Sequence, residues 1–196
     1  MTVHKSEEGR KGSPGIALTP GDRGDLVRAA RHALALHFRG PGKPVHVPKE
    51  SRLHQPGSAF VTLKKGSELR GCIGSIQTDR SLLEVVADSA VAAATRDPRF
   101  PPVLADELPD LQIQVSVLGP LKVVKEPEEV EIGRHGLRVC EGAAQGLLLP
   151  QVATEMQLDA VSFLEWTCLK AGLPRDAWRK GATIQVFTAD VFPPEP

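Results

Sequence analysis

Strict alternation of apolar and polar residues in the middle of the chain is the feature that most constrains its fold. The segment from Leu111 to Leu118 reads LQIQVSVL, and only an extended strand places successive side chains on opposite faces. The pattern predicts a strand with one buried face and one wetter face, ended by Gly119-Pro120. The fold must therefore contain a sheet with at least one buried face.

An amphipathic helix is predicted near the start of the chain. Residues 19–22 (TPGD) offer an N-cap hydroxyl, a proline at the first helical position and an acid in the first turn. Apolar residues then recur at helical spacing from Leu26 to Phe38, and Gly40-Pro41 ends the run. The charged stretch 1–16 can bury little surface, so it is predicted to be a disordered tail.

A β-hairpin is predicted between this helix and the central strand. Residues 59–63 (AFVTL) form its first strand, residues 64–67 its turn, and residues 69–76 its returning strand. Cys72 lies on that second arm.

A second helix follows the hairpin. Asp79 or Ser81 caps it, and Glu84 completes a capping box with Ser81. It must end near Asp97, because the prolines that follow cannot continue a helix.

The last third of the chain mixes short strands with helices. Its order does not repeat a strand-helix unit, so we predict an α+β fold with a mixed or mainly antiparallel sheet flanked by helices. Residues 17–194 are expected to form one domain of two closely packed lobes, with a core that 196 residues can bury. The predicted elements are a small meander over 121–124, 137–140 and 146–149, helices over 151–156 and 159–171, and a strand over 183–192.

Charge and cysteine content narrow the class of partner. Lysine plus arginine number 24 and aspartate plus glutamate number 24, so no long-range field favours nucleic acid or an anionic membrane. The three cysteines form no Cys-x-x-Cys pair, which argues against a metal site and suits a reducing compartment. The polar start lacks a signal-peptide core, and no apolar run is long enough to span a bilayer. A cytoplasmic protein without a cofactor is expected.

Several segments, taken together and in order, resemble the AMMECR domain family, whose prokaryotic members are called AmmeMemoRadiSam system protein A. The resemblance covers residues 18–192. It departs at Gln157-Leu158-Asp159, where the family leads us to expect Gly-Trp-Asp. The matching segments are FVTL (60–63), LRGCIGS (69–75), DPRFPP (97–102), VSVL (115–118), GRHGL (133–137), GLLLPQVA (146–153) and KAGLP (170–174).

This resemblance implies a two-lobed α+β fold with the cysteine motif near a cleft between the lobes, and no known reaction. It also implies two partners, a Memo-like protein and a radical SAM protein. We expect a cleft protein that acts with these partners on an unidentified small molecule or protein segment, through Cys72. The alternative is a non-catalytic scaffold or a substrate-delivery module of the same system.

Cys72 is the first candidate catalytic residue. Gly71 and Gly74 on either side would let a backbone or a ligand approach closely, so both are candidate binding residues. Arg70 lies two positions away, on the same face of a regular strand, and is a candidate cationic partner that would lower the pKa of the thiol. The alternative is a buried cysteine that packs as a small hydrophobe.

Three further residues are candidates, each with a structural alternative. His135 lies in a turn-like segment and could serve as a base for Cys72, or it could be a turn residue with a satisfied hydrogen bond. Arg99 could bind a carboxylate or phosphate, but Asp97 could instead pair with Arg99 or cap a backbone donor. Glu165 could join other carboxylates in acid/base work, or lie on a solvated helix face.

Overall fold

The structure is a computed structural model that describes residues 17–41, 45–76 and 79–192. The tail predicted over 1–16 and the domain end predicted at 194 lie outside the described residues. Within the described ranges, four short 3-10 helices connect the main elements: η1 (Arg52–His54), η2 (Ala105–Asp110), η3 (Pro127–Glu129) and η4 (Ala177–Arg179).

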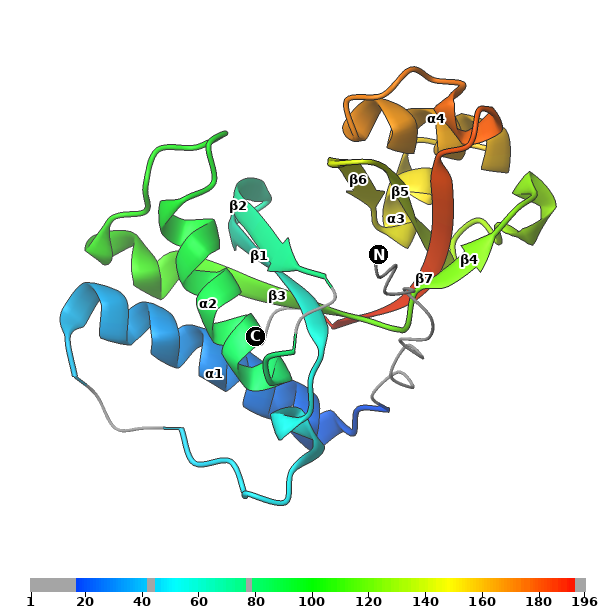
Figure 1. Ribbon diagram of the computed structural model, residues 1–196. Helices are drawn as coiled ribbons and strands as arrows, with labels where there is room; N and C mark the ends of the chain where they lie inside the picture. The colour runs from blue at the N-terminus through cyan, green and yellow to red at the C-terminus, as the bar shows by residue number, and fades with distance from the viewer. Residues whose placement is uncertain (1–16, 42–44, 77–78, 193–196) are drawn as a thin grey trace, which may run out of the picture.

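Among the described residues, a curled sheet of seven strands runs through the two lobes seen in Figure 1, and each pair of neighbouring strands is antiparallel. Six strands follow the order β2-β1-β3-β7-β5-β6, and β4 pairs with β7. The α+β prediction is therefore confirmed, with an antiparallel sheet. The strands are β1 (Ser58–Lys65), β2 (Glu68–Ser75), β3 (Leu111–Leu118), β4 (Lys122–Val124), β5 (His135–Glu141), β6 (Ala144–Leu148) and β7 (Thr183–Phe192).

Strand β7 connects the two lobes (Figure 1). Its last four residues, 189–192, pair with β3 in the first lobe. Its earlier residues pair with β5 on one side and with β4 on the other. One strand therefore belongs to both halves of the sheet, and the positions of the lobes depend on it.

The first lobe places two helices, α1 (Pro20–Arg39) and α2 (Leu82–Thr95), on one face of β1, β2 and β3 (Figure 1). Each helix begins with a complete capping box, formed by Thr19 with Asp22 and by Ser81 with Glu84. The helices bury alternate residues of β1 in a common apolar core that contains Val61. Each fully buried leucine or valine side chain stabilises such a core by about 1.5–3 kcal/mol.

The second lobe packs α3 (Pro150–Glu155) against β5, and α4 (Ala160–Lys170) against β5 and β6. Its core joins Phe163 and Leu164 of α4 to Leu137 of β5 and Val186 of β7. Both helices begin and end within two residues of the predicted positions. A proline starts α3, and the Asp159 side chain accepts the Ser162 N–H to start α4.

The predicted meander is wrong in one respect. Strands β5 and β6 form a hairpin, but β4 does not continue it, because β4 pairs with the far side of β7. The short apolar segment Lys122–Val124 contains no signal for its partner. Its position is set by the later strand β7, which lies about sixty residues further along the chain.

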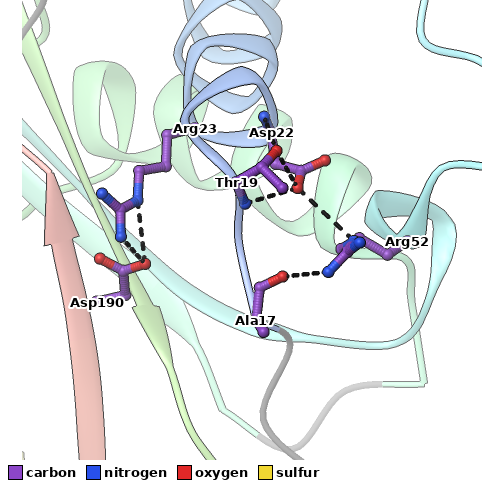
Figure 2. Close-up of polar contacts among 6 residues, drawn as sticks. All are labelled: Ala17, Thr19, Asp22, Arg23, Arg52 and Asp190. Atoms are coloured by element: carbon purple, nitrogen blue, oxygen red, sulfur yellow. Dashed lines mark hydrogen bonds and ion pairs between the residues drawn. The ribbon is translucent and has the colours of Figure 1, made fainter.

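Polar contacts anchor the start of α1 to the rest of the first lobe (Figure 2). Arg23 binds Asp190 of β7 with an N–O distance of 2.9 Å, and its guanidinium lies 5.9 Å from the ring centre of Phe192. Arg52 donates to the Ala17 carbonyl on the other side of the helix. The end of β7 is therefore held against α1 by charge as well as by packing.

Within the described part of the chain, no helix is both long and apolar enough to cross a bilayer.

Candidate functional site

The sheet of the first lobe has a mostly polar face that no helix of this lobe covers within the described residues, and we call it the open face. Ala59 and Val61 face the helices and are fully buried. Gly71 faces them too, because a Cβ there would lie 2.1 Å from the carbonyl oxygen of Ala93 on α2. Alternate residues of each strand point the other way. The open face carries Phe60, Thr62 and Lys64 of β1, Cys72 of β2, and Gln114 of β3.

A cavity of about 580 Å³ lies between the open face and the second lobe, and we call it the first cavity. Its size is that of a small-molecule site. Strands β1, β3 and β7 line one side, while α3 and the segment before β5 line the other. The lining residues are Lys64, Gln114, Gly133, Arg134, Pro150, Gln151, Thr154, Glu155, Thr188, Ala189 and Val191.

A second cavity of about 390 Å³ lies beside the other end of the open face. Residues of β1 and β2 line it together with residues of β5 and β6 from the second lobe. Both cavities therefore lie between the lobes. The lining residues are Phe60, Gly74, Ser75, Ile76, Arg138, Gln145, Gly146 and Leu147.

Cys72 lies on the open face between these two cavities. It pairs across the sheet with Thr62, and Thr62 pairs in turn with Gln114 of the first cavity. Gly74 of the second cavity is two residues further along β2. The Cys72 thiol is half-buried, and its sulfur accepts a hydrogen bond from Thr62 Oγ1 at 3.2 Å. Its direct partner across the sheet, Thr62, is polar.

The two glycines beside Cys72 serve packing. Gly71 admits the backbone of α2, as described above. At Gly74, a Cβ would lie 2.4 Å from the Phe60 ring, so the glycine lets this ring cover the strand. Other atoms do approach both glycines closely, as expected, but these atoms belong to the α2 backbone and to the Phe60 ring. A direct ligand contact at Gly71 or Gly74 stays a prediction.

Asp97 and Arg99 hold the backbone of Cys72 from outside the sheet. Asp97 Oδ2 accepts the Cys72 N–H at 2.8 Å, and Arg99 donates to the Cys72 carbonyl at 3.4 Å. Arg99 also binds Asp97 through Nε and Nη2, at 2.9 and 2.7 Å. The structural alternative at Asp97 is confirmed in both forms, since this carboxylate pairs with Arg99 and caps a backbone donor.

The Asp97 carboxylate is charged and shielded from water. Its side chain is 2% exposed, whereas that of Arg99 is 50% exposed. Hydrogen bonds from Arg99 hold the pKa of the Asp97 carboxyl well below its usual range, and the Cys72 N–H adds to the effect. This pair blocks the outward N–H and C=O of Cys72 on an edge strand, where they would otherwise be free to bind another chain.

Arg70 does not occupy the position expected from a regular strand. Leu63 pairs with Gly71 and Lys64 pairs with Leu69, so Arg70 is an extra residue at a β-bulge. Its guanidinium binds both carboxylate oxygens of Glu107, at 2.8 and 3.1 Å.

These bonds from Arg70 lower the pKa of Glu107 to about 2. The same guanidinium also donates to the carbonyls of Pro101 and Pro102. Its donors are directed at the protein, and no hydrogen bond among the described residues joins Arg70 to the Cys72 sulfur.

His135 begins β5 in the second lobe. Its Nδ1 accepts the Glu131 N–H at 3.1 Å. This contact agrees with the alternative role of His135 as a turn residue with a satisfied hydrogen bond. Its neighbours Gly133 and Arg134 line the first cavity. In the described residues no hydrogen bond joins His135 to Cys72, so a Cys/His pair stays a prediction that has no contact to support it.

Glu165 lies on α4, and the candidate carboxylates of this region serve different purposes. Glu165 accepts a long bond from Arg175 at 3.5 Å, and Asp159 caps α4. Glu155 lines the first cavity. No cluster of three or more potential metal ligands occurs among residues 17–41, 45–76 and 79–192. A binding role for Glu165 stays a prediction.

Comparisons with known proteins agree with this architecture. The family model for AMMECR1 matches residues 27–192. The chain belongs to the AMMECR1 family. A protein of Methanosarcina acetivorans is 51% identical over 178 residues, which cover 85% of this chain and 87% of that protein. Protein MK0488 of Methanopyrus kandleri is 46% identical over 181 residues, with 87% of each chain covered.

A solved AMMECR1-type structure has the same fold. It is the uncharacterized protein PH0010 from Pyrococcus horikoshii, which is 39% identical in sequence and matches with a TM-score of 0.75. The match covers 85% of this chain and 88% of that chain. The resemblance seen in the sequence is therefore confirmed.

The departure at residue 157 from the expected AMMECR1 pattern has a structural cost. Gln157 has a φ of +52°, in the left-handed region that glycine adopts most readily. The next residue, Leu158, packs against the core of the second lobe. Leu158 therefore fills an internal position, and its side chain belongs to the core more than to a binding surface.

Sequence reasoning missed most of the residues that line the first cavity of this AMMECR1 protein. Lys64 was assigned to a turn, but β1 continues through Lys65 and places Lys64 on the open face. The polar positions 112 and 114 were assigned to a wetter face without a function. One signal was available, because polar residues alternate along two segments that become neighbouring strands.

Proposed function

We propose that this AMMECR1 protein binds a small polar ligand in the first cavity, with Cys72 at the edge of the site. The observation that carries the proposal is the open face itself. Two polar side chains of this face, Lys64 on β1 and Gln114 on β3, line a cavity of about 580 Å³ instead of packing in a core. A sheet face that only needed solvation would not require a second lobe opposite it.

The surroundings of Cys72 favour a site over a scaffold. A purely structural cysteine is expected among apolar side chains, whereas Cys72 is half-buried beside the Thr62 hydroxyl. Its backbone is fixed by Asp97 and Arg99. These bonds fix the position of the thiol through the backbone and do not engage the sulfur itself. A reacting group needs support of this kind.

We further propose that the protein works in the cytoplasm with a Memo-like protein and a radical SAM protein. In this system it would present the bound ligand, and the partners would supply the redox chemistry. The alternative, a non-catalytic scaffold, is favoured by one feature. Trp166 and Leu169, one helical turn apart on α4, are 39% and 40% exposed, and Arg175 lies over the Trp166 ring. Aromatic and arginine side chains of this kind are common at protein interfaces.

Ligand binding is tested by a thermal-shift screen of polar metabolites on three proteins. The wild type is compared with Gln114→Trp, which fills the first cavity, and with Gln112→Trp, its matched control on the same strand and face. Gln112 does not line the cavity. We expect a ligand to raise the melting temperature of the wild type and the control but not of Gln114→Trp. Equal shifts in all three proteins, or no shift with any compound, would contradict the proposal.

The role of Cys72 is tested by its alkylation rate as a function of pH, with and without the ligand. Protection by the ligand in the wild type, and its loss in Gln114→Trp, would place the thiol at the site. Slow labelling with an ordinary thiol pKa, together with unchanged ligand binding by Cys72→Ser, would leave Cys72 without a catalytic role.

The scaffold alternative is tested with purified Memo-like and radical SAM proteins. Binding that is lost in Trp166→Ala but kept in Gln114→Trp would favour a scaffold that docks through α4.

A further inference from the structure

The charges that line the first cavity are not balanced by the protein. Lys64 on the open face has no ion pair or hydrogen bond from its side chain within the described residues. Glu155, at the end of α3 on the opposite wall, has none either. The two side chains do not pair with each other. Opposite charges that line one cavity without pairing are arranged to meet opposite charges on a ligand.

The neighbouring lysine and arginine show that this lack of partners is local. Lys65, next to Lys64 on β1, lies 3.7 Å from a Glu107 oxygen. Arg134, which also lines the cavity, binds Glu131 at 2.8 Å. Lys64 is therefore the cation on this wall whose charge is available to a ligand.

Neutral polar groups surround the two charges. Gln114 and Gln151 lie on opposite walls, and Thr154 and Thr188 add hydroxyl groups. An amide can donate and accept hydrogen bonds at once. In the described residues neither glutamine side chain has a protein partner. Among the described residues the cavity thus offers one cation and one anion that have no protein partner, Lys64 and Glu155, and two uncommitted amides.

The lining also argues against a nucleotide. None of the residues that line this cavity is aromatic. Nucleobases are held in most protein sites by stacking on aromatic rings or on arginine planes, and the arginine present here, Arg134, is already paired. An aliphatic ligand fits the lining better.

We propose that the first cavity binds a small aliphatic zwitterion, such as an amino acid, with its carboxylate at Lys64 and its ammonium group at Glu155. This inference rests on the proposed function, because it names the ligand class of the same cavity. The two amides then bind the polar side chain or backbone of the ligand. A molecule with a carboxylate alone would leave the charge of Glu155 without an opposite charge on the ligand.

The test uses isothermal titration calorimetry with the aliphatic L-amino acids, including glutamine, and with their N-acetyl and carboxamide forms. Lys64→Met should weaken binding of the free amino acid about tenfold, and Glu155→Gln should do the same, since each removes one charged contact. The N-acetyl and carboxamide forms each lack one charge of the ligand, so each can be paired with the variant that lacks the matching charge on the protein. Glu155→Gln should not affect the N-acetyl form, and Lys64→Met should not affect the carboxamide. Lys65→Met is the matched control and should bind like the wild type.

Two results would overturn the inference. If the blocked forms bind the wild type as tightly as the free amino acid does, Lys64 and Glu155 do not recognise the charged groups of the ligand. A loss in Lys65→Met equal to that in Lys64→Met would show a general effect of charge. If no amino acid binds, but another metabolite binds in a manner that Gln114→Trp abolishes, the ligand class is wrong and the proposed function stands. If no compound binds in a manner that Gln114→Trp abolishes, both this inference and the proposed function are wrong.

Discussion

The two lobes stabilise themselves by different means. Two ion pairs beside β2 in the first lobe are partly shielded from water: the Arg70 and Glu107 side chains are 15% and 16% exposed, and Asp97, which binds Arg99, is 2% exposed. In the second lobe, the pairs lie in solvent, as for Arg134 and Glu131, which are 65% and 55% exposed. Exposed pairs contribute about 0–1 kcal/mol, whereas breaking a buried pair costs several. The stability of the edge strand β2 therefore depends on ion pairs, and that of β6 depends on packing.

Both lobes also place a glycine of an edge strand against a helix, and this shared feature gives the largest predicted effect. A Cβ at Gly71 would lie 2.1 Å from the Ala93 carbonyl oxygen of α2, and one at Gly146 would lie 2.4 Å from the Ala171 nitrogen. We expect Gly71→Ala to lower the free energy of unfolding by about 3 kcal/mol or more, because the backbone of a helix must move.

Urea unfolding measures that loss. Gly146→Ala should cost a similar amount in the second lobe. Gly21→Ala is the control: its Cβ meets no atom closer than 3.8 Å, and it lies in the first turn of α1, where alanine favours the helix, so it should not lower stability. A mild effect of Gly71→Ala, equal to that of Gly21→Ala, would mean that α2 is not held tightly against β2.

Asp97→Asn should have the next largest effect. It removes the charge that binds Arg99 and turns an amide NH₂ toward one of the two backbone N–H groups, of Cys72 and Arg99, whose hydrogen bonds Asp97 accepts. We expect a loss of about 2 kcal/mol in urea unfolding, together with faster alkylation of Cys72, because β2 opens locally. Glu131→Gln, which breaks an exposed pair in the second lobe, should leave the urea unfolding curve close to that of the wild type. Equal losses would remove the contrast between the lobes.

Acid should weaken the first lobe before the second. The pKa of Glu107 is about 2 in the folded protein, below its ordinary value of 4.5, because Arg70 binds the carboxylate. A depressed pKa stabilises the fold above the ordinary value, and this contribution is lost as the pH falls from about 4.5 toward 2. We expect a loss of about 2 kcal/mol, reduced from the full linkage value by partial exposure.

Hydrogen exchange followed at a series of pH values distinguishes the lobes. Peptides from β1 and β2 should lose protection at a higher pH than peptides from β5 and β6. In Glu107→Gln this early loss should disappear, since the titrating group is gone. Simultaneous loss in both lobes would show that the acid response is global.

The smallest predicted effect is a gain in the second lobe. Gln157 adopts a φ of +52°, which costs a non-glycine residue energy. Gln157→Gly should therefore raise the free energy of unfolding by about 0.5–1 kcal/mol, although the added flexibility of the unfolded chain offsets part of it. Thermal unfolding of the variant, beside Gln112→Gly as a control in a strand, measures the gain. A loss of stability in Gln157→Gly would show that the side chain has a contact that outweighs the strain.

Local patterns predicted the elements well, and non-local contacts explain what they missed. The capping box at Ser81 and the alternation over 111–118 act within a few residues, and both elements formed as predicted. The surroundings of Cys72 depend on Asp97, which is 25 residues away, and no periodicity reports such a contact. The bulge at Arg70 also breaks the strand period on which its predicted position depended.

The shared strand β7 has a consequence for how the chain reaches its native state. Leu118 of β3 pairs with Ala189, and Val124 of β4 pairs with Ile184, so both halves of the sheet need the last strand along the chain. Neither half of the sheet is complete until β7 has paired with it. Such late, long-range pairing slows folding, and it makes assembly of the whole domain a single closing event rather than two independent ones.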